Sequence, residues 1–126
     1  KSRVSFHKSV PKGFSVSYGS TWTSDGSTEI STIPLGYGDG FRRHLSNHGE
    51  VLIRGKRRAI VGRVCMDQFM VNSNNETLEV GDEVVLIGEQ DGQSITVEEM
   101  SGWAETIPYE ILTNLNDRIP RIYSNE

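Results

Sequence analysis

Cysteine is almost absent from this sequence. The 126 residues include a single one, Cys65, which excludes an internal disulfide and a zinc site built from several cysteines. A lone thiol is typical of proteins that work in a reducing compartment, so we expect a cytoplasmic location and no metal site.

Basic residues and long apolar runs are also scarce. Thirteen lysines and arginines stand against 17 acidic residues, which gives a net charge of −4 and argues against a nucleic-acid-binding protein, because such proteins carry a basic surface for phosphates. No apolar run is long enough to span a membrane or to form the core of a signal peptide.

The chain also lacks repeats, low-complexity segments and a convincing linker. Its length suits one compact domain, so we expect a single domain over residues 1–126. The sequence starts at Lys1 with a strand-like pattern and no initiator methionine, which leads us to expect a part of a longer protein.

Short stretches of alternating polar and apolar residues dominate what is present. This pattern, rich in β-branched residues and bounded by glycine and proline, predicts strands near residues 3–7, 13–17, 28–33, 51–53, 59–61, 68–71 and 83–87, and a tight turn at residues 91–92 leads into residues 94–95. Residues 54–57 (RGKR) join two of them and predict a hairpin with a glycine turn. Six or seven short, closely spaced strands favour a mainly β fold, a small closed barrel of the Greek-key type.

Helices are predicted only late in the chain. Thr96 and Glu99 form a capping box that begins a short helix ending near Ala104. Pro108 suits the first position of a second helix, because its missing N–H would be unpaired there. Residues 118–123 are predicted to form an edge strand, where a proline is tolerated.

Three segments suggest binding sites and also have simpler interpretations. Residues 36–40 (GYGDG) do not have the spacing of a dinucleotide-binding loop, and we interpret them as a bend that presents Tyr37. His44 and His48 have a zinc-like spacing but no nearby third ligand, so a solvated loop is favoured. The basic run at residues 54–58 is interpreted as a solvated hairpin tip.

The segment at residues 61–68 (VGRVCMDQ) has no obvious strand face. We interpret Cys65 as a buried small side chain rather than a nucleophile, and the segment as a possible source of backbone N–H donors. Tyr18, Tyr37 and Tyr109 lie at turns or at the ends of predicted elements, outside any clear apolar stripe. A tyrosine in such a place offers a hydroxyl for hydrogen bonding or, with its pKa lowered by nearby positive charge, a base.

These segments together resemble one family. VSYGSTW, IPLGYGDGFRR, VGRVCMDQFM, VGDEVVLIG and TIPYEI occur in this order and spacing in the C-terminal domain of alanine racemases. Each motif alone is weak, but five in the same order are specific, and the resemblance runs from about Val4 to Tyr123.

The resemblance implies a composite active site that uses pyridoxal phosphate. In the family, a lysine of an N-terminal barrel holds this cofactor, and one subunit's barrel meets the C-terminal domain of the other subunit in a homodimer. Tyr18 matches the tyrosine that exchanges a proton with the Cα of L-alanine. The backbone of Met66 matches a group that holds the substrate carboxylate, and Tyr109 matches a tyrosine that binds the cofactor phosphate. Residues matching the lining of the entrance channel are Tyr37, Arg43, Arg63 and Ile107.

The sequence contains no region for the N-terminal barrel, so we expect this chain alone to be inactive. The pocket with Tyr109 is expected to prefer alanine over serine. Alternatives are a serine/alanine racemase of the membrane-anchored resistance type, a related decarboxylase, and a β-barrel module for dimerisation or binding. The decarboxylase is disfavoured because it would need its own cysteine- and aspartate-bearing loop, which VCMDQ does not resemble.

Overall fold

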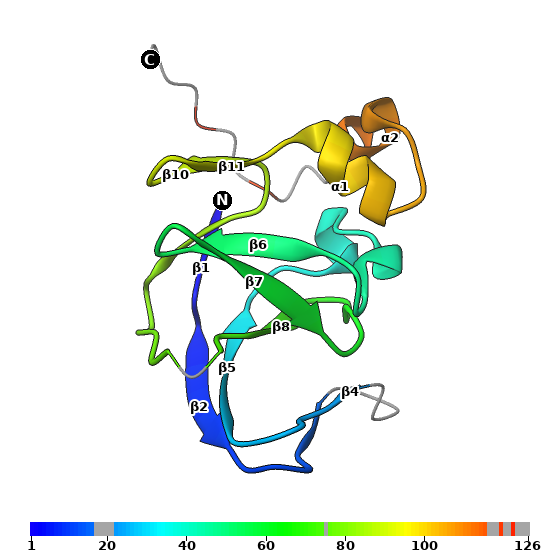
Figure 1. Cartoon of the computed structure of the whole chain (residues 1–126). Helices are drawn as coiled ribbons and strands as arrows, with labels where there is room; N and C mark the ends of the chain where they lie inside the picture. The colour runs from blue at the N-terminus through cyan, green and yellow to red at the C-terminus, as the bar shows by residue number, and fades with distance from the viewer. Residues whose placement is uncertain (17–21, 75, 116–118, 120–121, 123–126) are drawn as a thin grey trace.

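The computed structural model describes residues 1–16, 22–74, 76–115, 119 and 122, and its centre is one curled antiparallel sheet (Figure 1). The sheet has seven strands in the order β1-β9-β6-β7-β8-β5-β2. Their bounds are β1 Ser2–Arg3, β2 Phe6–Val10, β5 Thr28–Ile33, β6 Glu50–Ile53, β7 Lys56–Val61, β8 Phe69–Asn72 and β9 Glu83–Val85. Two short ribbons lie outside it, formed by β3 (Ser15–Val16) with β4 (Trp22–Thr23) and by β10 (Gly88–Gln90) with β11 (Gln93–Ile95).

The first strand segment closes the sheet into a barrel. β1 and β2 lie at opposite ends of the sheet, yet only Val4 and Ser5 separate them in the chain. The N–H of Val4 donates to the Asp82 carbonyl at 2.9 Å, and that of Ser5 donates to the Thr32 carbonyl at 2.9 Å. The predicted mainly β, barrel-like fold is therefore confirmed. Strands β5 to β8 have a Greek-key order, because β6, β7 and β8 are successive neighbours and β8 then lies beside β5.

The core explains why β6 is apolar at three successive positions. Val51 and Ile53 point into the barrel and belong to the main core cluster. Leu52 points to the opposite face, where Val85 and Ile95 cover it together with Trp103. A strand buried on both faces does not alternate. In β6 the outer face is covered by β11 and by Trp103 of α1, which lie above it (Figure 1).

Both predicted helices are present. The hydroxyl of Thr96 accepts a hydrogen bond from the N–H of Glu99 at 3.0 Å, and α1 (Val97–Trp103) follows it. Pro108 begins α2 (Pro108–Thr113). Two short 3₁₀ helices, η1 (Tyr37–Asp39) and η2 (Arg43–Leu45), lie after β5. The edge strand predicted at residues 118–123 falls mostly outside the described residues.

The hairpin between β6 and β7 has the predicted glycine turn, with φ of 54° at Arg54 and 71° at Gly55. Two successive positive φ angles are the geometry of a type I′ turn, which matches the twist of the paired strands. The solvated interpretation of this basic run is wrong for Arg58, which is 2% exposed. Its guanidinium donates to the carbonyls of Ile53 and Ser73 and pairs with Glu76.

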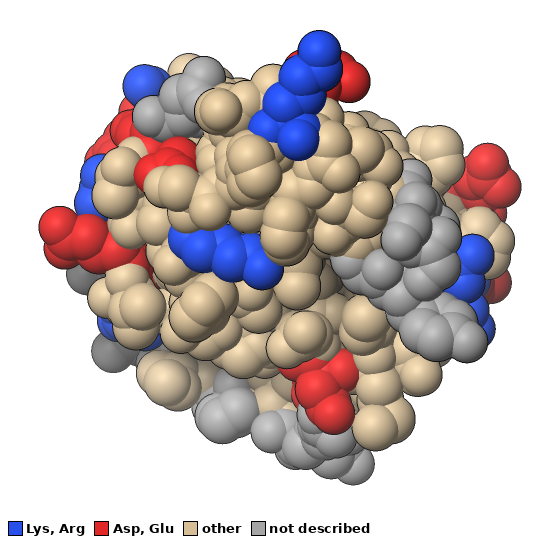
Figure 2. All heavy atoms as spheres, turned by 90° about the horizontal axis from the view of Figure 1, so that it is seen from below, with Lys and Arg blue, Asp and Glu red and all other residues tan. Residues whose placement is uncertain are grey.

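Charged side chains on the face below the barrel form small scattered groups rather than one patch (Figure 2). Such a surface differs from the continuous basic stripe that a phosphate backbone requires.

Candidate functional site

The proposed acid/base residue, Tyr18, lies outside the described residues. The strands on either side of it are described: β3 and β4 pair antiparallel, with Val16 opposite Trp22. The role of Tyr18 stays a prediction from the resemblance.

The glycine-rich turn and the cysteine-methionine loop pack directly on each other. We call residues 36–40 the Gly36 turn and residues 62–68 the Met66 loop. The N–H of Tyr37 donates to the Cys65 carbonyl at 3.0 Å, and the N–H of Gly38 donates to the Met66 carbonyl at 2.9 Å. A Cβ added at Gly36 would lie 2.1 Å from the Cys65 oxygen, so only glycine fits there. The predicted bend is confirmed, and its purpose is close contact between backbones.

Asp39 keeps the Gly36 turn in shape, a role that the sequence did not reveal. Its side chain is buried, and its carboxylate accepts a hydrogen bond from the N–H of Gly36 at 3.1 Å. Gly40 follows with φ of 101° and approaches α2 so closely that an added Cβ would lie 2.2 Å from the Asn114 carbonyl oxygen. The turn is thus fixed between the Met66 loop and the end of α2.

Three of the four residues assigned to the entrance channel lie near this turn. The guanidinium of Arg43 lies 5.6 Å from the ring centroid of Tyr37, a cation–π distance. Arg43 and Arg63 line one hollow with His44 and Ser46. The Ser46 hydroxyl accepts a hydrogen bond from the Val64 N–H at 2.8 Å, which holds the Met66 loop against η2.

Ile107 and Tyr109 lie at the start of α2 and are exposed; Tyr109 is 71% exposed. The helix is anchored instead by Ile111, which is buried in the main core cluster. A large apolar ring this exposed is available for contact with another part of a larger assembly.

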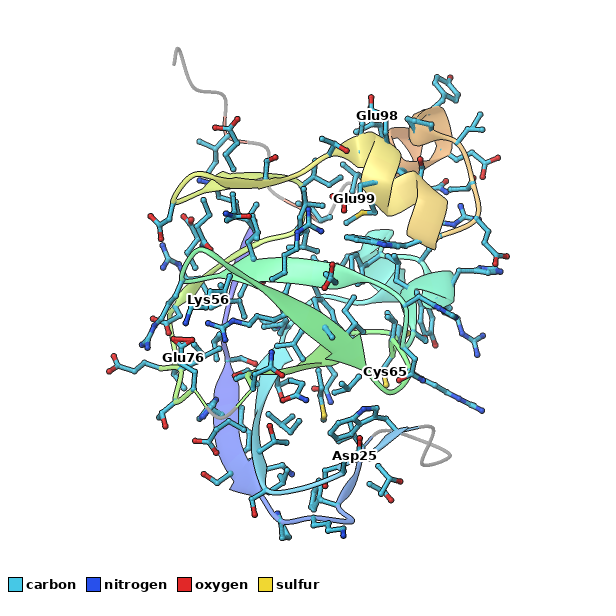
Figure 3. The ribbon with its side chains drawn as sticks, in the orientation of Figure 1. Asp25, Lys56, Cys65, Glu76, Glu98 and Glu99 are labelled. Carbon is cyan, nitrogen blue, oxygen red and sulfur yellow. The ribbon has the colours of Figure 1, made fainter. Side chains whose placement is uncertain are left out.

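Met66 presents a backbone donor. Its side chain is 52% exposed and its carbonyl is taken by Gly38. Among the hydrogen bonds of the described residues, the N–H of Met66 donates to no group. Cys65, beside it, is half-buried rather than buried as predicted, and Figure 3 places it at the opposite end of β7 from Lys56 and Glu76.

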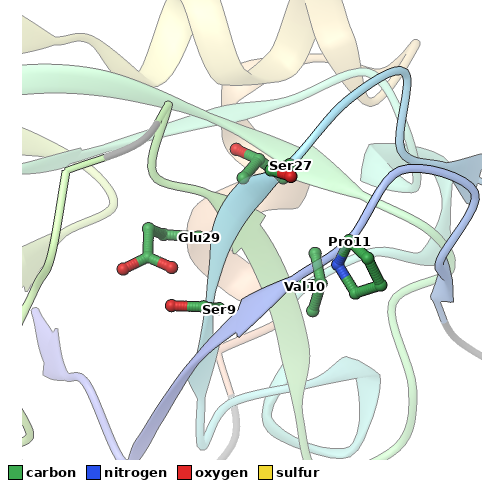
Figure 4. Close-up of a pocket in the computed structure, with 6 residues that line it drawn as sticks. Ser9, Val10, Pro11, Ser27 and Glu29 are labelled. Carbon is green, nitrogen blue, oxygen red and sulfur yellow. The ribbon is translucent and has the colours of Figure 1, made fainter.

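A separate open hollow of about 400 Å³ lies at the paired end of β2 and start of β5 (Figure 4). Its lining consists of Ser9, Val10, Pro11, Ser27, Thr28 and Glu29. None of these residues belongs to the proposed site, so the hollow lies apart from it.

Two kinds of feature, a cluster of metal-binding side chains and a membrane-spanning helix, are absent from the described residues. No group of three or more histidine, cysteine or acidic side chains converges there to hold a metal ion. Among the same residues, no helix combines the length and the apolar character needed to cross a membrane.

Comparison with known proteins decides the family. The family model described as the alanine racemase C-terminal domain matches residues 1–123. The chain belongs to the alanine racemase C-terminal domain family. This confirms the resemblance seen in the five motifs.

Relatives agree in sequence and in structure. The domain is 56% identical to alanine racemase of Carboxydothermus hydrogenoformans over 98% of this chain and 34% of that protein. It is 46% identical to alanine racemase of Halothermothrix orenii over 100% of this chain and 34% of the relative. Alanine racemase of Streptomyces coelicolor superposes with a TM-score of 0.94 at 44% identity, over 98% of this chain and 32% of that one. The domain therefore spans about a third of the length of these relatives.

Proposed function

We propose that this domain is the C-terminal part of an alanine racemase, an isomerase that interconverts L- and D-alanine. The proposal is carried by the 56% identity to a named alanine racemase over 98% of the chain. The packing of the Gly36 turn on the Met66 loop supports it, because within the described part of the chain that loop presents the Met66 N–H without a hydrogen-bond acceptor.

Tyr18 is proposed to move the proton on one face of the substrate. Racemisation requires removal of the Cα proton on one side and its return on the other, so it requires an acid/base group on each face. A phenol has an ordinary pKa of about 10 and needs nearby positive charge to act as a base. In this proposal Tyr18 serves the L-alanine face, and a lysine outside this chain serves the opposite face.

Met66 is proposed to hold the substrate carboxylate through its N–H. A backbone donor without an internal partner stabilises an anion at little reorganisation cost. Fixing the carboxylate turns the Cα–H bond toward the acid/base groups, which is a positioning effect.

Pyridoxal phosphate is the proposed cofactor, and this domain supplies only part of its site. Bound there, the cofactor serves as an electron sink that makes the Cα proton removable. The exposed hydroxyl of Tyr109 would donate to its phosphate, and the same ring would narrow the pocket around a methyl side chain. The exposure of Tyr109 and Ile107 fits residues that are covered by the rest of the enzyme, within a homodimer.

The test uses the full-length racemase that contains this domain, with Tyr18→Phe as the variant. In deuterated solvent, wild-type enzyme should label the Cα of both enantiomers. The variant should lose labelling of L-alanine while D-alanine is still labelled, and racemisation should fall by at least about 100-fold. Equal loss of labelling from both enantiomers would show that Tyr18 does not serve one face.

The isolated 126-residue chain provides the matching control. Incubated with pyridoxal phosphate and L-alanine, it should form no D-alanine above background. Robust turnover would show that the remainder of the enzyme is not required.

A further inference from the structure

Helix α2 is short and has no side-chain cap at its first turn. Its N-cap position is Ile107, which provides no side-chain acceptor for the unpaired N–H groups of the helix. Ile111 is its buried residue. The direction of the first turn, which carries Tyr109, therefore depends on contacts made by exposed side chains.

Arg42 and Glu110 provide such a contact. A guanidinium nitrogen of Arg42 lies 3.3 Å from the Glu110 carboxylate, and the hydroxyl of Thr106 donates to the same oxygen at 2.6 Å. Glu110 therefore links Thr106, just before α2, to Arg42, the residue before η2.

Arg42 lies between two hollows. It lines an apolar groove together with Leu35, Phe41 and Ile111, and it also lines a smaller pocket with Tyr37 and Asn114. Within the described part of the chain, its Nε is buried without a hydrogen-bond partner. Leaving a buried donor unpaired is unfavourable, so this side chain is not arranged for the greatest stability.

We propose that Arg42 is a positioning residue of the racemase site, acting through Glu110. The pair holds the segment that carries Tyr37 and Arg43 at a fixed distance from the turn that carries Tyr109. It thus sets both the width of the entrance channel and the place of the Tyr109 hydroxyl. This inference rests on the proposed racemase function.

If the Arg42–Glu110 pair had a purely structural role, its loss would lower the stability of the fold. The side chain of Arg42 is 26% exposed and that of Glu110 is 51% exposed, and ion pairs this exposed contribute little to stability. The close approach of Gly40 to Asn114 and the burial of Ile111 remain when the pair is removed. Loss of the pair should therefore leave folding intact and change the geometry of the site.

The experiment compares Arg42→Met with Arg54→Met in the full-length racemase. Arg54 forms an ion pair with Asp82 at 3.0 Å at the tip of the β6–β7 hairpin, away from α2, and is the matched control. Arg42→Met should lower kcat/KM for alanine by about tenfold and weaken retention of pyridoxal phosphate, because small misplacements of binding groups are costly. Arg54→Met should change neither, and neither variant should unfold at a lower urea concentration than the wild type.

Two further variants test the route through Glu110. Glu110→Gln, nearly the same shape without the charge, should reproduce the kinetic loss of Arg42→Met. The charge-reversed double variant, Arg42→Glu with Glu110→Arg, should recover most of it.

Kinetics of Arg42→Met or Glu110→Gln indistinguishable from those of Arg54→Met would overturn the inference, as would a double variant with no recovery. These results leave the proposed function standing, because only an unmodified full-length protein that fails to racemise alanine counts against that.

Discussion

Replacing Gly36 by alanine should break the contact between the Gly36 turn and the Met66 loop. The added Cβ would lie 2.1 Å from the Cys65 oxygen and 2.5 Å from the Met66 oxygen, whereas real Cβ contacts stay beyond 3.0 Å. Both obstacles are backbone atoms, so no side chain can swing away. One loop must move by roughly 1 Å.

That movement separates two hydrogen bonds, those from the N–H groups of Tyr37 and Gly38, at 3.0 and 2.9 Å. Each is worth about 0.5–1.5 kcal/mol net, which gives about 1–3 kcal/mol. Displacing the turn from Asn114 and straining its backbone adds about 1 kcal/mol. We therefore expect the free energy of unfolding to fall by about 2–4 kcal/mol.

The measurement is urea denaturation of the 126-residue chain, followed by tryptophan fluorescence. With a slope of about 1.5 kcal/mol per molar urea, the midpoint should fall by about 2 M. Gly26→Ala is the control, because an added Cβ there meets nothing within 4 Å. If both variants unfold at the wild-type midpoint, the close backbone contact is not present in the folded protein.

Three other predictions follow from separate features. Gly102→Ala, in α1 with no atom within 4 Å of the added Cβ, should raise the free energy of unfolding by about 0.5–1 kcal/mol through helix propensity and thus raise the urea midpoint; a lower midpoint would mean that the site is crowded. In the full-length enzyme, Tyr109→Asn should raise serine racemisation relative to alanine, and an unchanged ratio of kcat/KM would count against the steric role of the ring. Hydrogen bonds from Arg57 lower the pKa of Glu99 below its usual 4.5, so the stabilisation is present above about pH 5 and lost as the pH falls through the folded-state pKa. Urea midpoints measured from pH 6 to pH 3 should thus fall less steeply in Glu99→Gln than in wild type.

Local patterns predicted the elements well because their causes are local. The β6–β7 hairpin follows from the φ freedom of Gly55, and the starts of α1 and α2 follow from Thr96 and Pro108. These signals depend on a few neighbouring residues, so they hold whatever the tertiary structure of the rest of the chain. The strand alternation then limited the fold to a small barrel.

Burial and loop contacts were less predictable because they depend on distant partners. Arg58 belongs to a run of basic residues, and only the register of β7 turns it inward toward Ser73 and Glu76. The requirement for glycine at position 36 comes from the Cys65 carbonyl, which is remote in sequence. Nothing in the local sequence distinguishes Arg42 from Arg43, because its partner Glu110 lies on another element.

The closure of the barrel has a consequence for how the chain folds. Ser2 pairs with Val84 and Arg3 with Glu83, so the first strand of this domain is among the last to find its partner. Contacts this distant in sequence slow folding, because the entropy of closing a long loop is lost before the strand pairing stabilises the chain. During synthesis, the early strand must wait until most of the domain has left the ribosome. Until then the open edges of β1 and β5 are exposed to pairing with other chains.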